Sequence, residues 1–201
     1  MPRRKGTCLT RQDVVEAAIS CLQQEGEESL GVNRVARALG IQPPSLYNHV
    51  AGNGDLRQAV ALEGLKRLMA HLRHHTDGIP DRQERVRALA HAYRDFAHTH
   101  DALYAVLSTV SFDPMDPHYQ PAIQDWMSFY DDRLKPFGLQ GDAVIHGARF
   151  LLSTLHGFVQ MERSGKFRLE QPRDQSYSWI IQALIDALEA SGSSPAQLSN
   201  T

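Results

Sequence analysis

The chain has 201 residues, of which 42% are hydrophobic and 22% charged, and its formal net charge at neutral pH is −2. These values are ordinary for a globular protein with a small N-terminal unit and one larger core. No run approaches the ~18 consecutive apolar residues of a membrane span, and MPRRKG at the N-terminus lacks the apolar stretch of a secretion signal. Cys8 and Cys21 make no disulfide framework, so we expect a reduced, cytoplasmic location without a membrane partner.

The first predicted helix runs from about Thr10 to Gln24, with Val14, Ala18 and Leu22 on one apolar face. A basic arm of Arg3, Arg4 and Lys5 precedes it. Residues 1–50 carry a net charge of +1, whereas the remainder of the chain carries −3. The N-terminal part can therefore present a positive face to nucleic acid although the whole chain is slightly acidic.

Residues 31–50, GVNRVARALGIQPPSLYNHV, predict two short helices joined by a tight turn. An apolar stripe at helical spacing marks the first helix, which we expect Asn33 to cap and Gly40 to end in a left-handed conformation. Pro43 and Pro44 suit the start of a second helix, which extends to Val50. The set left on its outer side consists of Ser45, Tyr47, Asn48 and His49. This pattern is typical of a helix-turn-helix that enters the DNA major groove, although a surface pair of helices has the same spacing.

The rest of the chain predicts further helices and no strands. A long helix follows the first domain, and Thr76–Pro80 ends it. The expected fold is all-α with about nine helices, in which this long helix joins a three-helix head to a larger helical bundle. The predicted domains are 1–55 for DNA binding, 56–190 for a helical bundle, and a disordered tail at 191–201. The predicted helices after the head span residues 56–74, 82–99, 101–110, 119–135, 141–163 and 174–190.

The last two helices are apolar on more than one face, so they must be covered on two sides. Either one of them is buried inside a monomer, or both form a four-helix bundle with a second copy. A homodimer would have an interface formed by Phe150, Leu151, Phe158, Trp179, Ile181, Leu184 and Leu188.

Residues Thr10–Leu56 resemble the N-terminal domain of the TetR family of bacterial transcriptional regulators. The resemblance depends on Ala17-Ala18, Glu25-Gly26, the run VARALGI, and SLYNHV followed by Asp55-Leu56. A weaker resemblance links LLSTLHGFVQME, residues 151–162, to the ligand-binding half of one TetR subgroup. The family implies a homodimeric repressor that a small molecule releases from a palindromic operator in double-stranded DNA. It also implies that residues 56–190 form the ligand-binding and dimerisation domain.

Under this hypothesis, base edges are read by Pro43, Ser45, Asn48 and His49, and Asn48 suits adenine. The phosphate contacts are assigned to the arm (Arg3, Arg4, Lys5) and to Thr10, Asn33, Arg37 and Tyr47. Many relatives carry a lysine at the level of Asn53 or Gly54 that meets a phosphate. Here that contact is absent or reduced to the Asn53 amide or a backbone N–H.

The expected effector is a small apolar or amphipathic molecule, and no cofactor is expected. Its candidate pocket consists of Tyr93, Phe96, Phe112, Trp126, Tyr130, Arg149 and His156. Aromatic residues at helical spacing can equally be ordinary core. Arg149 and His156 are stronger candidates, because a buried polar group needs a partner, which could also be protein.

A metal site and a catalytic site are both poorly supported. His71, His74 and His75 have a spacing that could ligate a metal, but no cysteine or carboxylate lies among them, so we interpret them as a solvated helix face. No phosphate loop, nucleophile elbow or HExxH motif is present, so we do not expect an enzyme. The alternatives are an all-helical enzyme and a helical protein- or substrate-binding module without sequence-specific DNA binding. Neither explains the basic arm and the exposed Tyr47–His49 together.

Overall fold

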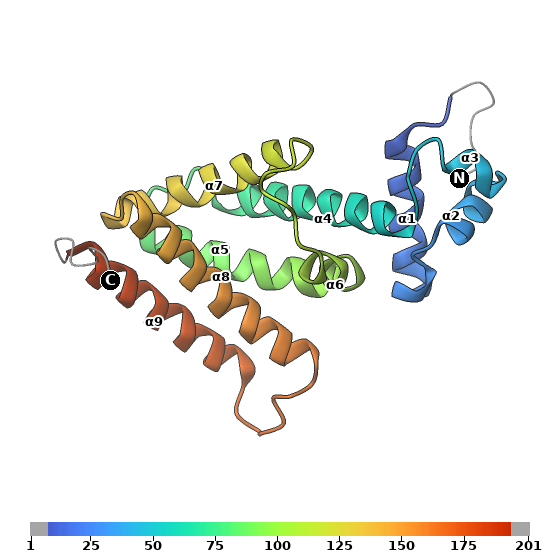
Figure 1. Cartoon of the computed structure of the whole chain (residues 1–201). Helices are drawn as coiled ribbons and strands as arrows, with labels where there is room; N and C mark the ends of the chain where they lie inside the picture. Colours follow the sequence, from blue (N-terminus) through green and yellow to red (C-terminus); the bar gives the residue numbers. More distant parts are fainter. Residues whose placement is uncertain (1–7, 194–201) are drawn as a thin grey trace, which may run out of the picture. The chain divides into compact units, whose positions relative to one another are not determined.

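The computed structural model describes residues 8–193, and every regular element in that range is helical (Figure 1). The all-α prediction is confirmed: this range contains nine α-helices, two short 3-10 helices and no strand. Two compact units can be distinguished, one formed by the residues up to Arg67 together with His100–Gln120, and the other by Leu68–Thr99 together with the residues from Pro121 onward. Helix α4, Asn53–Thr76, contributes to both units. Within the described range, no helix is long and apolar enough to cross a membrane.

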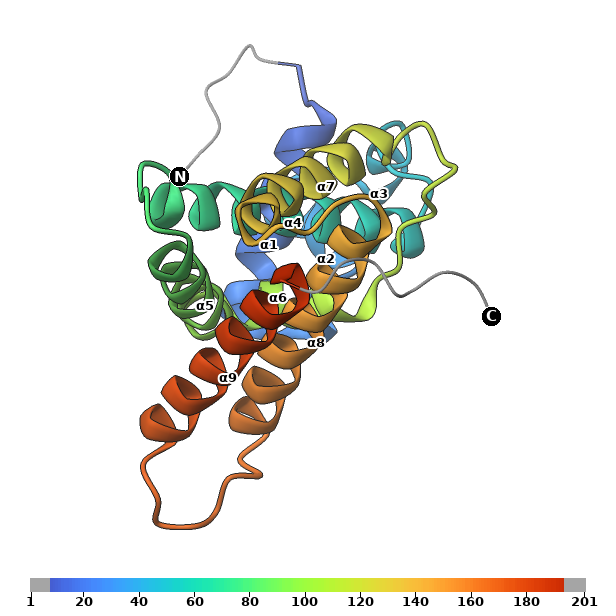
Figure 2. The same cartoon turned by 90° about the vertical axis from the view of Figure 1, so that its left-hand side faces the viewer.

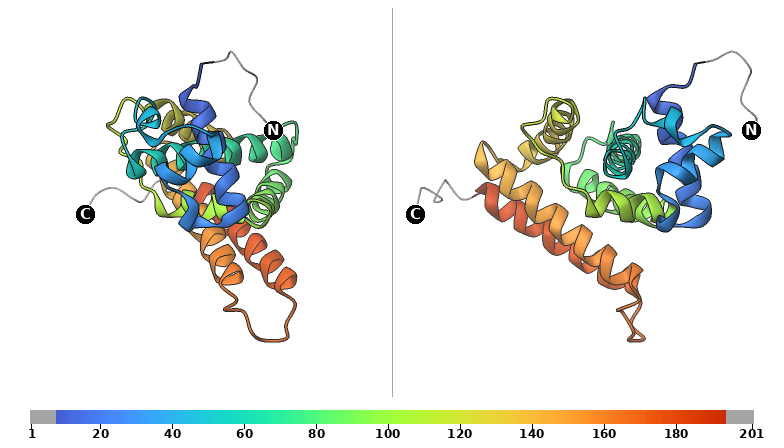
Figure 3. Two further views of the ribbon diagram at one scale, coloured as in Figure 1. Left: turned by 90° about the vertical axis from the view of Figure 1, so that its right-hand side faces the viewer. Right: turned by 45° about the vertical axis from the view of Figure 1, so that its right-hand side comes forward.

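The first unit contains the predicted three-helix head, in which α2 packs against both α1 and α3 (Figure 3, blue). Its core consists of residues from all three helices and the following turn, among them Val14, Ala18, Val35, Leu46 and Val50, each at most 1% exposed. Its elements are α1 (Arg11–Glu25), η1 (Glu27–Ser29), α2 (Val32–Leu39), α3 (Pro43–Leu46), the first part of α4, and α6 (Asp101–Thr109).

The ends of α1 and α2 follow from local chemistry. Thr10 caps α1 in a reciprocal arrangement, because its hydroxyl accepts from the Asp13 amide while the Asp13 carboxylate accepts from the Thr10 amide. Gly40 ends α2 in the left-handed region at φ 67°, as predicted. The prediction that Asn33 caps α2 was wrong. Gly31 occupies the N-cap position and Asn33 lies exposed within the first turn.

The second helix of the pair is shorter than predicted. Helix α3 ends at Leu46, and residues 47–49 form a turn. The amides of His49 and Val50 both donate to the Leu46 carbonyl, at 2.9 and 3.1 Å, and these bonds close the turn. Leu46 and Val50 are nonetheless buried, as the apolar spacing predicted.

In the second unit, α8 and α9 lie side by side (Figure 2, orange and red), and both pack against α5. The predicted bounds of α5 agree with the structure, and those of α7 and α8 agree to within one residue at each end. The elements of this unit are the end of α4, α5 (Arg82–Thr99), α7 (Gln120–Leu134), η2 (Lys135–Phe137), α8 (Asp142–Arg163) and α9 (Arg173–Ser193).

Helix α9 continues into the segment that was predicted as a disordered tail. Residues 191–193 are helical, and Gly192 packs directly against η2. A Cβ atom at Gly192 would overlap the carbonyl oxygen of Phe137, so the missing side chain is what permits this contact. The prediction was therefore wrong for residues 191–193, and residues 194–201 lie outside the described range.

Candidate functional site

The predicted base-reading residues lie on α3 and the turn that follows it. Ser45 and Asn48 are exposed, whereas Pro43 and His49 are half-buried. Tyr47, predicted to contact phosphate, is 56% exposed although it is a large aromatic residue. The buried Leu46 and Val50 hold this segment on the core of the first unit, so its polar side chains remain available to a ligand.

The remaining predicted phosphate contacts have varied surroundings. Asn33 and Arg37 are exposed on α2. The Thr10 side chain is exposed but takes part in the cap of α1 described above. Arg3, Arg4 and Lys5 lie outside the described residues. Each of these assignments stays a prediction.

Asn53 has a structural contact that the sequence did not reveal. Its side-chain oxygen accepts from the Val32 amide at 2.9 Å, so the first residue of α4 caps the N-terminus of α2. Gly31, the N-cap residue, has no side chain for this purpose. The sequence around Asn53 gave no signal for this contact, because Asn53 and Val32 are 21 residues apart.

We expect Asn53→Ala to lower the free energy of unfolding by about 1 kcal/mol, because it removes a helix cap. Gly31→Ser in the same chain should restore most of this loss. Its backbone at φ −149° and ψ 148° is the extended conformation of a capping serine. Urea unfolding of the single and double variants measures both effects. Gly31→Ala is the matched control, and equal rescue by alanine would contradict the capping explanation.

Arg11 and Asp55 form a second contact that the sequence pattern missed. The Arg11 guanidinium donates to both Asp55 carboxylate oxygens, at 3.0 and 2.5 Å, and to the His49 carbonyl at 2.5 Å. Asp55 also accepts from the Ala51 amide at 2.8 Å. Their mutual hydrogen bond is the main reason why the pKa of Arg11 is raised and that of Asp55 is lowered.

The candidate ligand-binding residues are only partly brought together. In the second unit, the Tyr93 hydroxyl on α5 lies 3.4 Å from His156 Nδ1 on α8, and burial lowers the pKa of His156. Trp126 and Tyr130 pack ring to ring on α7, with centroids 4.9 Å apart. Tyr130 is 1% exposed, and burial raises its pKa.

The remaining three candidates have varied surroundings. Phe96 is 1% exposed and belongs to the core of the second unit. Arg149 is exposed, so the structure does not place its side chain in a buried pocket. Phe112 belongs to the first unit, where its ring lies 5.2 Å from that of Tyr119. Sequence periodicity could not show this, because it does not reveal which elements pack together.

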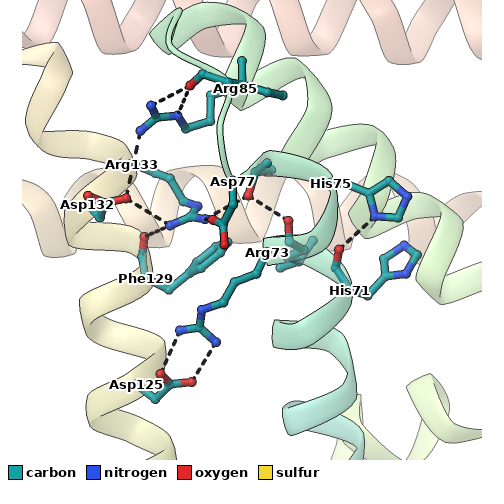
Figure 4. Close-up of polar contacts among 12 residues, drawn as sticks. His71, Arg73, His75, Asp77, Arg85, Asp125, Phe129, Asp132 and Arg133 are labelled. Atoms are coloured by element: carbon teal, nitrogen blue, oxygen red, sulfur yellow. Dashed lines mark hydrogen bonds and ion pairs between the residues drawn. The ribbon is translucent and has the colours of Figure 1, made fainter.

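One cavity of the second unit, of about 260 Å³, is polar and contains none of the predicted ligand-binding residues. Arg133 is one of the residues that line it. Its guanidinium is buried, stacks 3.5 Å from the Phe129 ring centre and donates to Thr76 and Asp77 (Figure 4). Burial lowers the pKa of Arg133, and Asp77 partly opposes this effect. These contacts join the end of α4 to α7. The cavity is lined by Thr76, Asp77, Gly78, Arg85, Asp132 and Arg133.

Most of the predicted dimer residues belong to the core of the single chain. Leu151, Phe158, Ile181, Leu184 and Leu188 are at most 6% exposed, because α5, α8 and α9 cover one another. These five residues, which were predicted to form the dimer interface, therefore have little surface left for a second copy. Phe150 and Trp179 remain exposed, at 43% and 73%, and Met161 at 41% shares this property.

Known proteins resemble the chain in both its sequence and its fold. The family described as the tetracyclin repressor-like C-terminal domain matches residues 86–184. The uncharacterized HTH-type transcriptional regulator Rv0681 of Mycobacterium tuberculosis is 35% identical over 157 residues, which are 78% of this chain and 72% of that protein. The uncharacterized HTH-type transcriptional regulator YobS of Bacillus subtilis is 29% identical over 184 residues, which are 90% and 93% of the two chains.

A solved structure with the same fold is that of a TetR variant from Acinetobacter baumannii in complex with minocycline. Its TM-score is 0.72, and the match covers 93% of this chain and all of that one, at 19% sequence identity. At this identity the likeness concerns the fold.

Proposed function

Because the chain belongs to the TetR family of DNA-binding transcriptional regulators, we propose that it is a repressor released from a palindromic operator by a small molecule. The observation that supports this proposal most strongly is the segment of Ser45, Tyr47 and Asn48, exposed above the buried Leu46 and Val50. Polar side chains on a short element held by two apolar anchors suit major-groove recognition. We infer that the protein acts in the cytoplasm and is not an enzyme.

A second copy of the chain completes the proposed regulator. Two heads, with half-sites about one DNA turn (~34 Å) apart, are needed to read a palindrome. The exposed apolar residues Phe150, Met161 and Trp179 on α8 and α9 support pairing with a second copy. Gly157, on the same helix as Phe150, has open space where a side chain would begin, so another helix can approach closely there.

We propose a small apolar or amphipathic effector, bound in the second unit near Tyr93, His156, Trp126 and Tyr130. Aromatic walls with a few polar groups suit such a molecule. The A. baumannii protein, which has the same fold, binds the small molecule minocycline, and this supports a small-molecule effector here. The effector of this chain has to be identified by screening compounds. Thermal shift with a compound library, followed by release of a labelled duplex, tests this part of the proposal.

The first experiment is selection of bound duplexes from a random pool, followed by anisotropy titration at several salt concentrations. A ligand-responsive regulator should enrich a palindrome with half-sites about one turn (~34 Å) apart and bind it in a salt-dependent manner. If neither enrichment nor salt-dependent binding occurs, the proposal fails. The second unit would then be better explained as a protein- or substrate-binding module.

We expect Asn48→Ala to relax specificity at one base pair of each half-site, at a cost of about 1–3 kcal/mol for the preferred base. Asn48 is exposed, so the substitution should leave stability within about 0.5 kcal/mol. Repeating the selection with the variant measures the effect position by position. Equal weakening on every sequence would assign Asn48 to the DNA backbone instead.

A further inference from the structure

The turn that carries Asn48 and His49 is closed by two backbone hydrogen bonds, from the His49 and Val50 amides to the Leu46 carbonyl. Helix α3 has four residues, and Asn48 and His49 follow it in a turn. The position of a side chain in a groove depends on the backbone that carries it, and contacts displaced by about 1 Å lose much of their energy. A contact from outside the segment can fix the turn further.

Arg11 supplies such a contact from the first turn of α1. Its Nη1 donates to the His49 carbonyl at 2.5 Å, although the two residues are 38 positions apart. Asp55, in the first turn of α4, accepts from the Ala51 amide at 2.8 Å. The bidentate bond between Arg11 and Asp55 links these two contacts, so the backbone is held on both sides of Val50.

We propose that Arg11 and Asp55 are positioning residues that fix the turn after α3 and thereby determine how sharply the protein distinguishes its operator from other DNA. This inference rests on the proposed reading of bases by Asn48 and His49. The Arg11 guanidinium makes three hydrogen bonds inside the first unit, which differs from the free cation expected for a direct phosphate contact. Its effect on DNA binding is therefore indirect.

The test compares affinity for two probes: the duplex enriched by the wild-type protein and a random-sequence duplex of equal length. We expect Arg11→Ala to weaken binding of the enriched duplex at least about tenfold, the size of one lost base contact, and to change random-duplex binding little. The slope of affinity against salt should stay that of the wild type, since no phosphate contact is lost. Asp55→Ala should reproduce this result. The double variant should lose much less binding free energy for the enriched duplex than the two single variants lose together.

Arg34→Ala is the matched control. Arg34 on α2 also pairs with a carboxylate of the same unit, but its partner is Glu25 at the end of α1. The substitution removes the same charge. It should leave the specificity ratio unchanged, by which we mean the affinity for the enriched duplex divided by that for the random-sequence duplex. Arg11→Lys keeps the charge but offers a single donor nitrogen in place of the planar guanidinium, so it should retain only part of the wild-type preference for the enriched duplex.

The readouts separate this inference from its competitors. A uniform loss on both probes, with a salt slope lowered by about 0.9 per head, would show that Arg11 binds phosphate directly. A specificity ratio equal to that of the wild type would also overturn the inference. If the wild-type protein enriches no duplex, the proposed function fails and this inference falls with it. Should the alanine variants unfold, faster hydrogen exchange across residues 47–51 in folded Arg11→Lys supports the positioning role, and unchanged exchange contradicts it.

Discussion

Replacing Glu162 with alanine should destabilise the protein by about 3 kcal/mol, the lower end of the range for breaking a buried ion pair. The Glu162 side chain is 5% exposed. It accepts two bonds from Arg94, at 2.5 and 2.8 Å, and lies 2.8 Å from His98 Nε2. Arg94 also pairs with Asp174 at 2.8 Å, so the variant leaves it with one carboxylate partner, which is why we expect the lower figure.

Urea unfolding should report this loss as a lower midpoint with an unchanged slope. Asp125→Ala is the matched control, because Asp125 also receives two bonds from one arginine, Arg73, but its side chain is 53% exposed (Figure 4). The control should cost less than about 1 kcal/mol. Equal losses in the two variants would contradict the importance of burial.

The contribution of Glu162 should also depend on pH in a defined direction. The hydrogen bond from Arg94 is the main cause that lowers its pKa below the ordinary value of 4.5, and His98 adds to the effect. A carboxyl group whose pKa is lower in the folded state stabilises the protein above its unfolded pKa. That stability is lost as the pH falls through the folded value. The difference in unfolding free energy between the wild type and Glu162→Gln should therefore shrink as the pH falls below about 4.5.

Replacing Trp179 with glutamate should raise the dissociation constant of the proposed dimer by about 10³-fold. A buried interface tryptophan contributes about 2 kcal/mol, and the two-fold symmetry of a dimer counts each substitution twice. Trp179 is 73% exposed in the single chain, so the variant should still fold. Sedimentation velocity measures the dimer, and anisotropy measures the accompanying loss of operator binding.

The control for this prediction is Leu169→Glu. Leu169 is 84% exposed but lies in the connection between α8 and α9 and belongs to neither helix. The same charge introduced there should leave the dimer unchanged. Phe150→Glu provides an independent check on α8, where the side chain is 43% exposed. A dimer of wild-type strength in both the Trp179 and Phe150 variants would exclude this interface.

The sequence alone predicted the elements well because their signals are local. Apolar residues at helical spacing, with proline and glycine at the breaks, predicted α5 to the residue. The left-handed Gly40 and the buried Leu46 and Val50 were also predicted, since each depends on neighbours within one or two turns. The resemblance of Thr10–Leu56 to the TetR family followed from the same stretch, and the likeness to known regulators confirms the family.

Only the tertiary structure decided which surfaces and contacts these elements make. Leu151 and Leu184 could have faced either a second copy or the same chain, because periodicity shows that a face is covered but not by what. Asn53 and Arg11 find their partners 21 to 44 residues away. Such distant contacts arise when packed helices bring remote side chains together, and no local pattern encodes them.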